Sequence, residues 1–260
     1  NPNEHGFVSN NSKYKSEFYT LAEVFLDNGY KTATFNNINK FIQSGLSQGF
    51  EIVNYPTFNM ENFLENERRG CSTAKETTQR AINWLGDSID SNRFGWVHYC
   101  DPHIIFKDEI DMLEYWQENE NIANGFFPTD KNLAMAMNTY DSRIADVDHE
   151  FRRLKNYYDN NVDASSTLWI ITSDHGEGLG EHGYYGHVGL MYEEQLQTPL
   201  IILLPKNQKA LVQDLSPSEN IELYQIVLNL LGFDMSEYNN KIIENNNFKS
   251  QDGISRAFSG

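Results

Sequence analysis

The segment of the sequence best equipped for chemistry runs from Ser173 to His187. It holds three histidines, three acidic residues and five glycines. Asp174 offers carboxylate oxygens and His175 an imidazole nitrogen, and both are ligands that divalent cations accept. Side chains of neighbouring residues diverge in a strand, but the glycine after His175 permits a turn that brings them together. The pattern predicts a metal- or anion-binding loop to which His182 and His187 return.

Two apolar runs must hold this loop, one at 168–172 and the other at 200–204. Both have the length of strands and lack polar alternation, which is typical of strands buried on both faces. Ligands are often gathered in loops at the carboxyl ends of parallel strands. The alternative is a solvated polar loop. We prefer a functional loop because His, Asp and Gly are concentrated between two core strands.

Elsewhere in the chain, a predicted helix is followed by a short strand, which makes one α/β unit. Thr73 and Glu76 form a capping-box pattern, and Gly29 and Gly232 follow apolar helical patterns as C-terminal caps. The predicted helices cover 21–28, 73–85, 132–158 and 219–232, and further predicted strands cover 31–35 and 93–99.

The strand predicted at 93–99 delivers Asp101, Pro102 and His103 into a loop. His103 therefore follows the end of a predicted strand. His98 lies within the strand body and is interpreted as a core histidine or one that supports the site.

Composition restricts the partners. The net charge of −17 argues against nucleic acid and against an anionic membrane surface, since both require a basic face. A length of 260 residues predicts one domain or one domain with a small appendage. No run is apolar enough to span a membrane and no signal peptide is recognisable, so we expect a cytoplasmic location while the compartment stays open.

A series of motifs carries a resemblance to a known family. They are 172–177 (TSDHGE), 180–183 (GEHG), 186–187 (GH), 192–194 (YEE) and 198–202 (TPLII). In this order, over roughly forty residues, they resemble the C-terminal half of a sulfatase catalytic domain. That family belongs to the alkaline-phosphatase-like superfamily of metal-dependent phosphate and sulfate ester hydrolases.

The resemblance implies a mixed, mostly parallel central sheet with helices on both faces, in an α/β fold that is N-terminally incomplete. We expect a partial catalytic domain at 1–236 and a polar C-terminal tail at 237–260. Residues 104–131 are expected to form an insertion over the mouth of the site.

The resemblance also implies roles for single residues. Asp174 and His175 are expected to bind a divalent metal ion, Ca²⁺ in the first place, with Mg²⁺ or Mn²⁺ as alternatives. His103, His175 and His187 are expected to be catalytic, with His103 or His187 as the general acid. Three further side chains are expected beside the site: His98, Glu177 and His182.

The implied activity is metal-dependent hydrolysis of sulfate esters of small molecules or glycans. Most sulfatases have Lys where His187 stands, so the choice between sulfate and phosphate esters stays open. The alternatives are a phosphodiesterase, phosphonate hydrolase or phosphoglycerol transferase, or a non-catalytic protein that binds sulfated or phosphorylated glycans. The leaving group is not predicted.

Two pieces of the family pattern are not found in this sequence. One is a strand that ends in metal-binding acids, and the other is the nucleophile motif C/S-x-P-S-R. We expect them in a segment upstream of Asn1. Alternatively, a partner chain supplies them, or the protein is a relative that has lost its activity.

Overall fold

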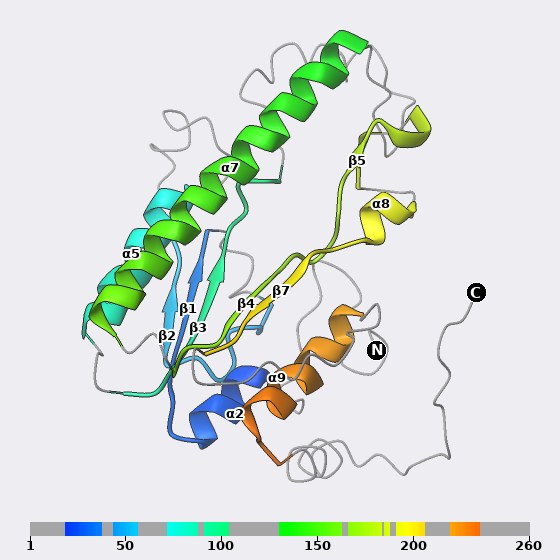
Figure 1. Ribbon diagram of the computed structural model, residues 1–260. Coiled ribbons are helices and arrows are strands. Elements are labelled where there is room, and N and C mark those ends of the chain that lie inside the picture. The colour runs from blue at the N-terminus through cyan, green and yellow to red at the C-terminus, as the bar shows by residue number, and fades with distance from the viewer. Residues whose placement is uncertain are drawn as a thin grey trace, which may run out of the picture.

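Strands at the centre of the molecule are covered by helices in the described part of the chain (Figure 1). The computed structural model describes residues 19–37, 44–56, 72–87, 91–103, 130–162, 166–183, 185–187, 191–205 and 219–234. The predicted insertion at 104–131, apart from its last two residues, and the predicted tail at 237–260 lie outside these ranges.

Four helices carry the packing: α2 (Leu21–Asp27), α5 (Ala74–Asp87), α7 (Asp130–Asn161) and α9 (Leu223–Leu231). Three were predicted from apolar periodicity and α5 from its capping box. α5 and α7 extend a few residues beyond the predicted bounds, whereas α9 begins at Leu223, after a 3-10 turn at Asn220–Glu222. Their length and composition have one further consequence. None of the helices within the described ranges is both long and apolar enough to cross a membrane.

The helix ends follow the predicted capping chemistry. The Thr73 amide donates to the Glu76 carboxylate at 2.8 Å, and the Glu76 amide donates to the Thr73 hydroxyl at 3.1 Å, which is the predicted capping box of α5. Gly232 caps α9 with φ 71°, in the left-handed region.

Three strands form a parallel sheet in the order β2-β1-β3. They are β1 (Lys31–Asn36), β2 (Ile52–Asn54) and β3 (Arg93–His98). β1 pairs with β3 along its whole length, ending at Asn36 opposite His98. Because parallel strands run the same way, their carboxyl ends lie at one edge of the sheet.

Helices cover both faces of this sheet, as predicted. Phe35 packs against Trp84 of α5, with ring centroids 5.6 Å apart. Phe94 stacks on Phe25 of α2 at 4.1 Å. Phe94 points to the opposite face from Phe35, because it lies three residues from Val97, the register partner of Phe35.

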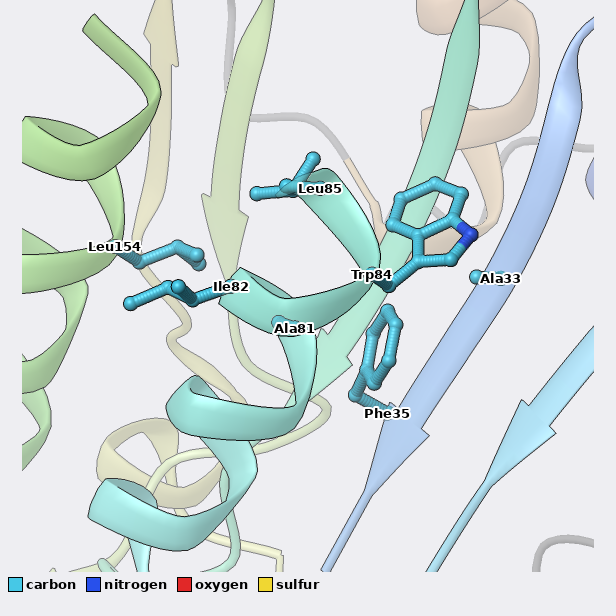
Figure 2. Packing of buried hydrophobic residues seen from close by; sticks show 7 residues of the cluster. All are labelled: Ala33, Phe35, Ala81, Ile82, Trp84, Leu85 and Leu154. Atoms are coloured by element: carbon cyan, nitrogen blue, oxygen red, sulfur yellow. The ribbon is translucent and has the colours of Figure 1, made fainter. Parts of the chain in front are cut away.

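The main hydrophobic core fills the space between the sheet, α5 and α7 (Figure 2). Leu154 brings α7 into this core, and partly buried Trp169 packs against it from a separate strand. The buried members are Ala33, Phe35, Ala81, Ile82, Trp84, Leu85 and Leu154.

The two apolar runs that flank the histidine-rich loop form an antiparallel pair, β4 (Trp169–Thr172) and β7 (Leu200–Leu203). The prediction that both are buried on both faces is wrong for the described residues, because Ile201 is 47% exposed. Length and apolar content alone do not say which neighbouring element covers a strand.

The cover that α7 provides differs along one face of this strand pair. Ile201 is paired with Ile171 and therefore shares a face with Trp169. At the Trp169 end, that face is covered by Phe151 and Tyr158 of α7, at 5.5 and 5.6 Å between ring centroids. The α7 aromatic contacts found in the described residues stop short of Ile201.

Candidate active site

The loop after β3 is fixed at two points before it reaches His103. The Asp101 carboxylate accepts hydrogen bonds from the backbone amide of Ala74, at the start of α5, at 2.9 Å and from the Asn37 side chain at 3.3 Å. The His103 amide then donates to the Cys100 carbonyl at 3.0 Å and closes a turn. This places His103 just beyond the carboxyl edge of the sheet, as the sequence predicted.

The end of β4 is held by a residue from the far end of the chain. The side-chain amide of Asn220 donates to the carbonyls of Ser173 and Asp174, at 3.0 and 3.1 Å. The Asp174 carboxylate itself is 84% exposed, with one oxygen accepting from the His175 amide at 3.0 Å. The fold therefore fixes the backbone here and leaves the carboxylate available.

His175 is oriented by its own backbone neighbourhood. Its Nδ1 lies 2.7 Å from the Gly176 carbonyl, which is only an acceptor, so Nδ1 carries the proton and Nε2 keeps a lone pair. Nε2 lies 3.8 Å from an Asp174 carboxylate oxygen. This is the tautomer that a metal-binding histidine needs.

A short hairpin brings the next histidine back. β5 (Gly178–Leu179) and β6 (Tyr185–Gly186) pair antiparallel, so Glu177 before the hairpin lies beside His187 after it. Both Glu177 carboxylate oxygens lie within hydrogen-bond distance of His187 Nδ1, at 3.0 and 3.2 Å. The Glu177 side chain is only 7% exposed, so the fold buries a carboxylate against this imidazole.

Three imidazoles converge from these loops. The His175 and His187 rings are stacked at 4.2 Å between centroids, and the His103 ring approaches His187 edge-on at 5.3 Å. The structure thus brings together the three histidines that the sequence singled out as catalytic candidates, together with Glu177.

The surroundings push the pKa values of two of these histidines in opposite directions. The hydrogen bond from Glu177 raises the pKa of His187, against a smaller opposing effect of desolvation. Desolvation of the ring, followed by the charge of His187, lowers the pKa of His103, although the residue as a whole is exposed. A pair of histidines with opposite shifts can supply one charged and one neutral imidazole to a bound anion.

His98 lies under the site at the end of β3. Its Nδ1 is buried and meets no hydrogen-bond partner in the part of the chain that the structure describes. Desolvation lowers its pKa, while the negative charge of Asp174 acts in the opposite direction. This position fits the expected supporting role, in which a neutral ring fills space beneath the loop.

His182 makes its described contacts at the tip of the hairpin, away from the three imidazoles. Its Nδ1 lies 3.0 Å from a Glu194 carboxylate oxygen, and its ring is stacked on Tyr192 at 4.1 Å. Its φ of 59° is in the left-handed region, which is uncommon for a residue with a Cβ. These contacts and this conformation fix the turn between β5 and β6.

Sequence reasoning did not single out three residues that the structure brings to this region. Asn220 supports the end of β4, and Gln195 contacts the hairpin from the short helix α8 (Glu193–Leu196). Tyr140 on α7 has its pKa raised by desolvation and then by the charge of Glu177, which places it near that carboxylate. Their contacts are non-local, so no spacing along the chain could have predicted them.

Comparison with known proteins identifies the class first. A phosphonate monoester hydrolase from Silicibacter pomeroyi superposes with a TM-score of 0.65 at 17% identity, covering 90% of this chain and 62% of that structure. With its sulfatase neighbours, this match defines the alkaline-phosphatase-like fold. The sulfatase family profile matches residues 1–233, and the chain belongs to the sulfatase family.

Curated relatives match over shorter stretches. An N-acetylglucosamine-6-O-sulfatase of Bacteroides thetaiotaomicron is 34% identical over 99 residues, which is 38% of this chain and 18% of that protein. The phosphoethanolamine transferase EptA of Salmonella typhimurium is 37% identical over 75 residues, which is 27% of this chain and 14% of that protein. The aligned parts are thus less than a fifth of either relative.

Proposed function

We propose that this chain carries part of the active site of a metal-dependent hydrolase of sulfate esters. The observation that carries the proposal is the convergence of His103, His175 and His187 with the buried Glu177 on His187. An anionic tetrahedral ester needs cationic or hydrogen-bonding groups on several sides, because the protein as a whole is strongly acidic.

Asp174 and His175 are close enough together to provide two ligands of one divalent cation. Bonds from such ions to oxygen and nitrogen are about 2.0–2.6 Å, so two donors on one ion lie within about 5 Å of each other. The Asp174 oxygen and His175 Nε2 are 3.8 Å apart, and Nδ1 of His175 is already satisfied. The described residues contain no cluster of three such ligands. We propose that the remaining ligands are the upstream acids that the family resemblance implies.

When bound, a divalent cation would polarise the ester oxygens and stabilise the attacking group. We propose Ca²⁺, because Asp174 provides hard oxygen ligands, with Mg²⁺ and Mn²⁺ as alternatives that His175 admits. The choice is testable by restoring chelated protein with each ion in turn.

His187 and His103 act on the substrate's remaining oxygens in this proposal. With Nδ1 held by Glu177, His187 has its Nε2 left to face the ester and donate a proton to the leaving alkoxide. Hydrolysis then converts the sulfate ester and water into an alcohol and hydrogen sulfate. His103 remains neutral and binds a non-bridging oxygen. We assign the nucleophile to none of the residues in this sequence.

The test is turnover of an aryl sulfate by the full-length natural protein. His187→Ala is expected to lower kcat by tens-fold or more, because the leaving group loses its proton donor. His149→Ala is the matched control, since His149 is an exposed histidine on α7. An unchanged kcat in His187→Ala would remove His187 from the mechanism.

Phosphorus esters are the second candidate substrates. The observation that favours them is the match to a phosphoethanolamine transferase. The family resemblance implies lysine in most sulfatases but histidine in many relatives at the position of His187, which leaves both ester classes open. Both ester classes are tetrahedral anions, so the same groups could bind either. Comparing kcat/KM for an aryl sulfate, an aryl phosphonate monoester and a phosphodiester decides between them, and turnover of none would favour a binding protein.

A further inference from the structure

The short helix α8 has an inverted pattern of burial. Gln195 is 4% exposed, whereas the neighbouring Leu196 is 57% exposed. A helix normally buries the apolar residue and leaves the amide in water, so a buried glutamine calls for a specific hydrogen-bonding reason.

Gln195 connects two parts of the site. Its backbone carbonyl accepts from the Gly176 amide at 2.8 Å, directly after His175. Its side-chain nitrogen donates to the Gly186 carbonyl at 2.8 Å, directly before His187. One residue therefore holds both backbone segments whose histidine rings are stacked at 4.2 Å.

Because α8 approaches closely, there is no room for a side chain at Gly176, whose amide makes the first of these contacts. A Cβ added to Gly176 would lie 2.2 Å from the Glu194 carbonyl oxygen and 2.7 Å from that of Gln197. Glycine is required here for space, so that the backbone after His175 can lie directly on α8.

The other end of the Gln195 amide is unsatisfied. Its Oε1 is buried and has no hydrogen-bond partner among the described residues, a feature that destabilises a fold. The amide cannot be turned over, because the Gly186 carbonyl is only an acceptor and must face the nitrogen. The described hydrogen bond of the buried Gln195 side chain thus holds the Gly186 carbonyl, directly before His187.

We propose that Gln195 is a positioning residue, which sets the spacing between His175 and His187 and through it the rate of ester hydrolysis. The inference rests on the proposed function for its catalytic part. Its structural part concerns two imidazoles and can be measured without any substrate.

The test compares Gln195→Met with Gln197→Met in the full-length protein. Methionine keeps the length of the side chain but cannot donate to Gly186. Gln197 is an exposed glutamine whose side chain makes only a long, 3.4 Å contact with Glu193 among the described residues, so its substitution controls for the chemical change itself.

The first measurement is NMR of the imidazole rings, with His175, His187 and His149 assigned from single His→Gln variants. Gln195→Met should shift the His175 and His187 signals and leave the His149 signals unchanged. It should also lower kcat for an aryl sulfate about tenfold, with KM changed by less than about twofold. Gln197→Met should alter none of these quantities. Unshifted His187 signals in Gln195→Met would overturn the inference.

A further measurement needs no variant and therefore survives a folding failure. In the natural protein, hydrogen exchange at the Gly176 amide should be as slow as in stable parts of the fold, because Gln195 accepts that hydrogen. Rapid exchange would contradict the hydrogen bond from Gly176 to Gln195 and overturn the coupling of the two histidine segments through Gln195. Shifted imidazole signals in a protein that hydrolyses neither sulfate nor phosphorus esters would instead overturn the proposed function and leave the coupling in place.

Discussion

The imidazole rings of His175 and His187 are stacked with their centroids 4.2 Å apart and their planes 30° from parallel. One ring follows β4 and the other follows the β5–β6 hairpin, so the contact joins a strand end to a loop. Each ring also has its Nδ1 held, His175 by the Gly176 carbonyl and His187 by Glu177. Both rings can therefore offer Nε2 to the same ligand.

The carboxylate on His187 should matter for turnover. Glu177→Gln keeps the size of the side chain but removes its charge, so we expect kcat for the preferred ester to fall roughly tenfold or more. Glu194→Gln is the control, because it removes the partner of His182 at the tip of the same hairpin and should change kcat by less than about twofold. Equal losses in both variants would show a general effect on the hairpin.

Metal binding should be visible in stability as well as activity. A cation at a hundred times its Kd stabilises the folded protein by about 2.7 kcal/mol, so Ca²⁺ or Mn²⁺ should raise Tm after chelation. Asp174→Asn should abolish most of this increase, because it removes a charged ligand. A full Tm increase in Asp174→Asn would exclude Asp174 as a ligand.

Gly176→Ala should destabilise the protein through crowding. The new Cβ would overlap two carbonyl oxygens, and overpacking of this kind typically costs about 1–3 kcal/mol. Gly95→Ala is the comparison, since its Cβ would meet Trp84 at an ordinary 3.5 Å. Urea unfolding measures both, and equal losses of unfolding free energy would contradict the close approach of α8.

Stability should depend on pH through His98. Because burial lowers its folded pKa, the unfolded chain binds more protons between that pKa and 6.5. Unfolding free energy should therefore rise with pH across this window and fall as the solution is acidified below 6.5. One proton accounts for at most about 1.4 kcal/mol per pH unit.

His98→Gln should reduce that slope, and urea unfolding between pH 5 and 7.5 measures the change. The same substitution at exposed His149 is the control and should leave the slope as it is. If His98→Gln retains the full slope, other groups cause the acid sensitivity.

Much of the framework could be predicted because it depends on local patterns. The capping box at Thr73 and the glycine cap at Gly232 mark the start of α5 and the end of α9. Residue type alone made Asp174 and His175 candidate metal ligands, which remains a prediction. These features need only neighbours within a few positions in the sequence.

The supporting contacts could not be predicted because they join distant segments. A four-residue helix is too short to show a period, so nothing marks Gln195 as buried and Leu196 as exposed. An apolar run does not say which helix covers it, and Ile201 is exposed for that reason. The sequence likewise offers both Glu177 and Glu181 near His187, and only the hairpin register selects Glu177.

The contact between α2 and α9 bears on how the protein folds during synthesis. Val24 and Leu228 are both fully buried against each other's helices, although roughly 200 residues separate them along the chain. Asn220, just before α9, also holds the carbonyls at the end of β4. The loop after β4, which bears Asp174, therefore gains these hydrogen bonds only once the chain as far as Asn220 has left the ribosome, later than the α5–α7 core can form.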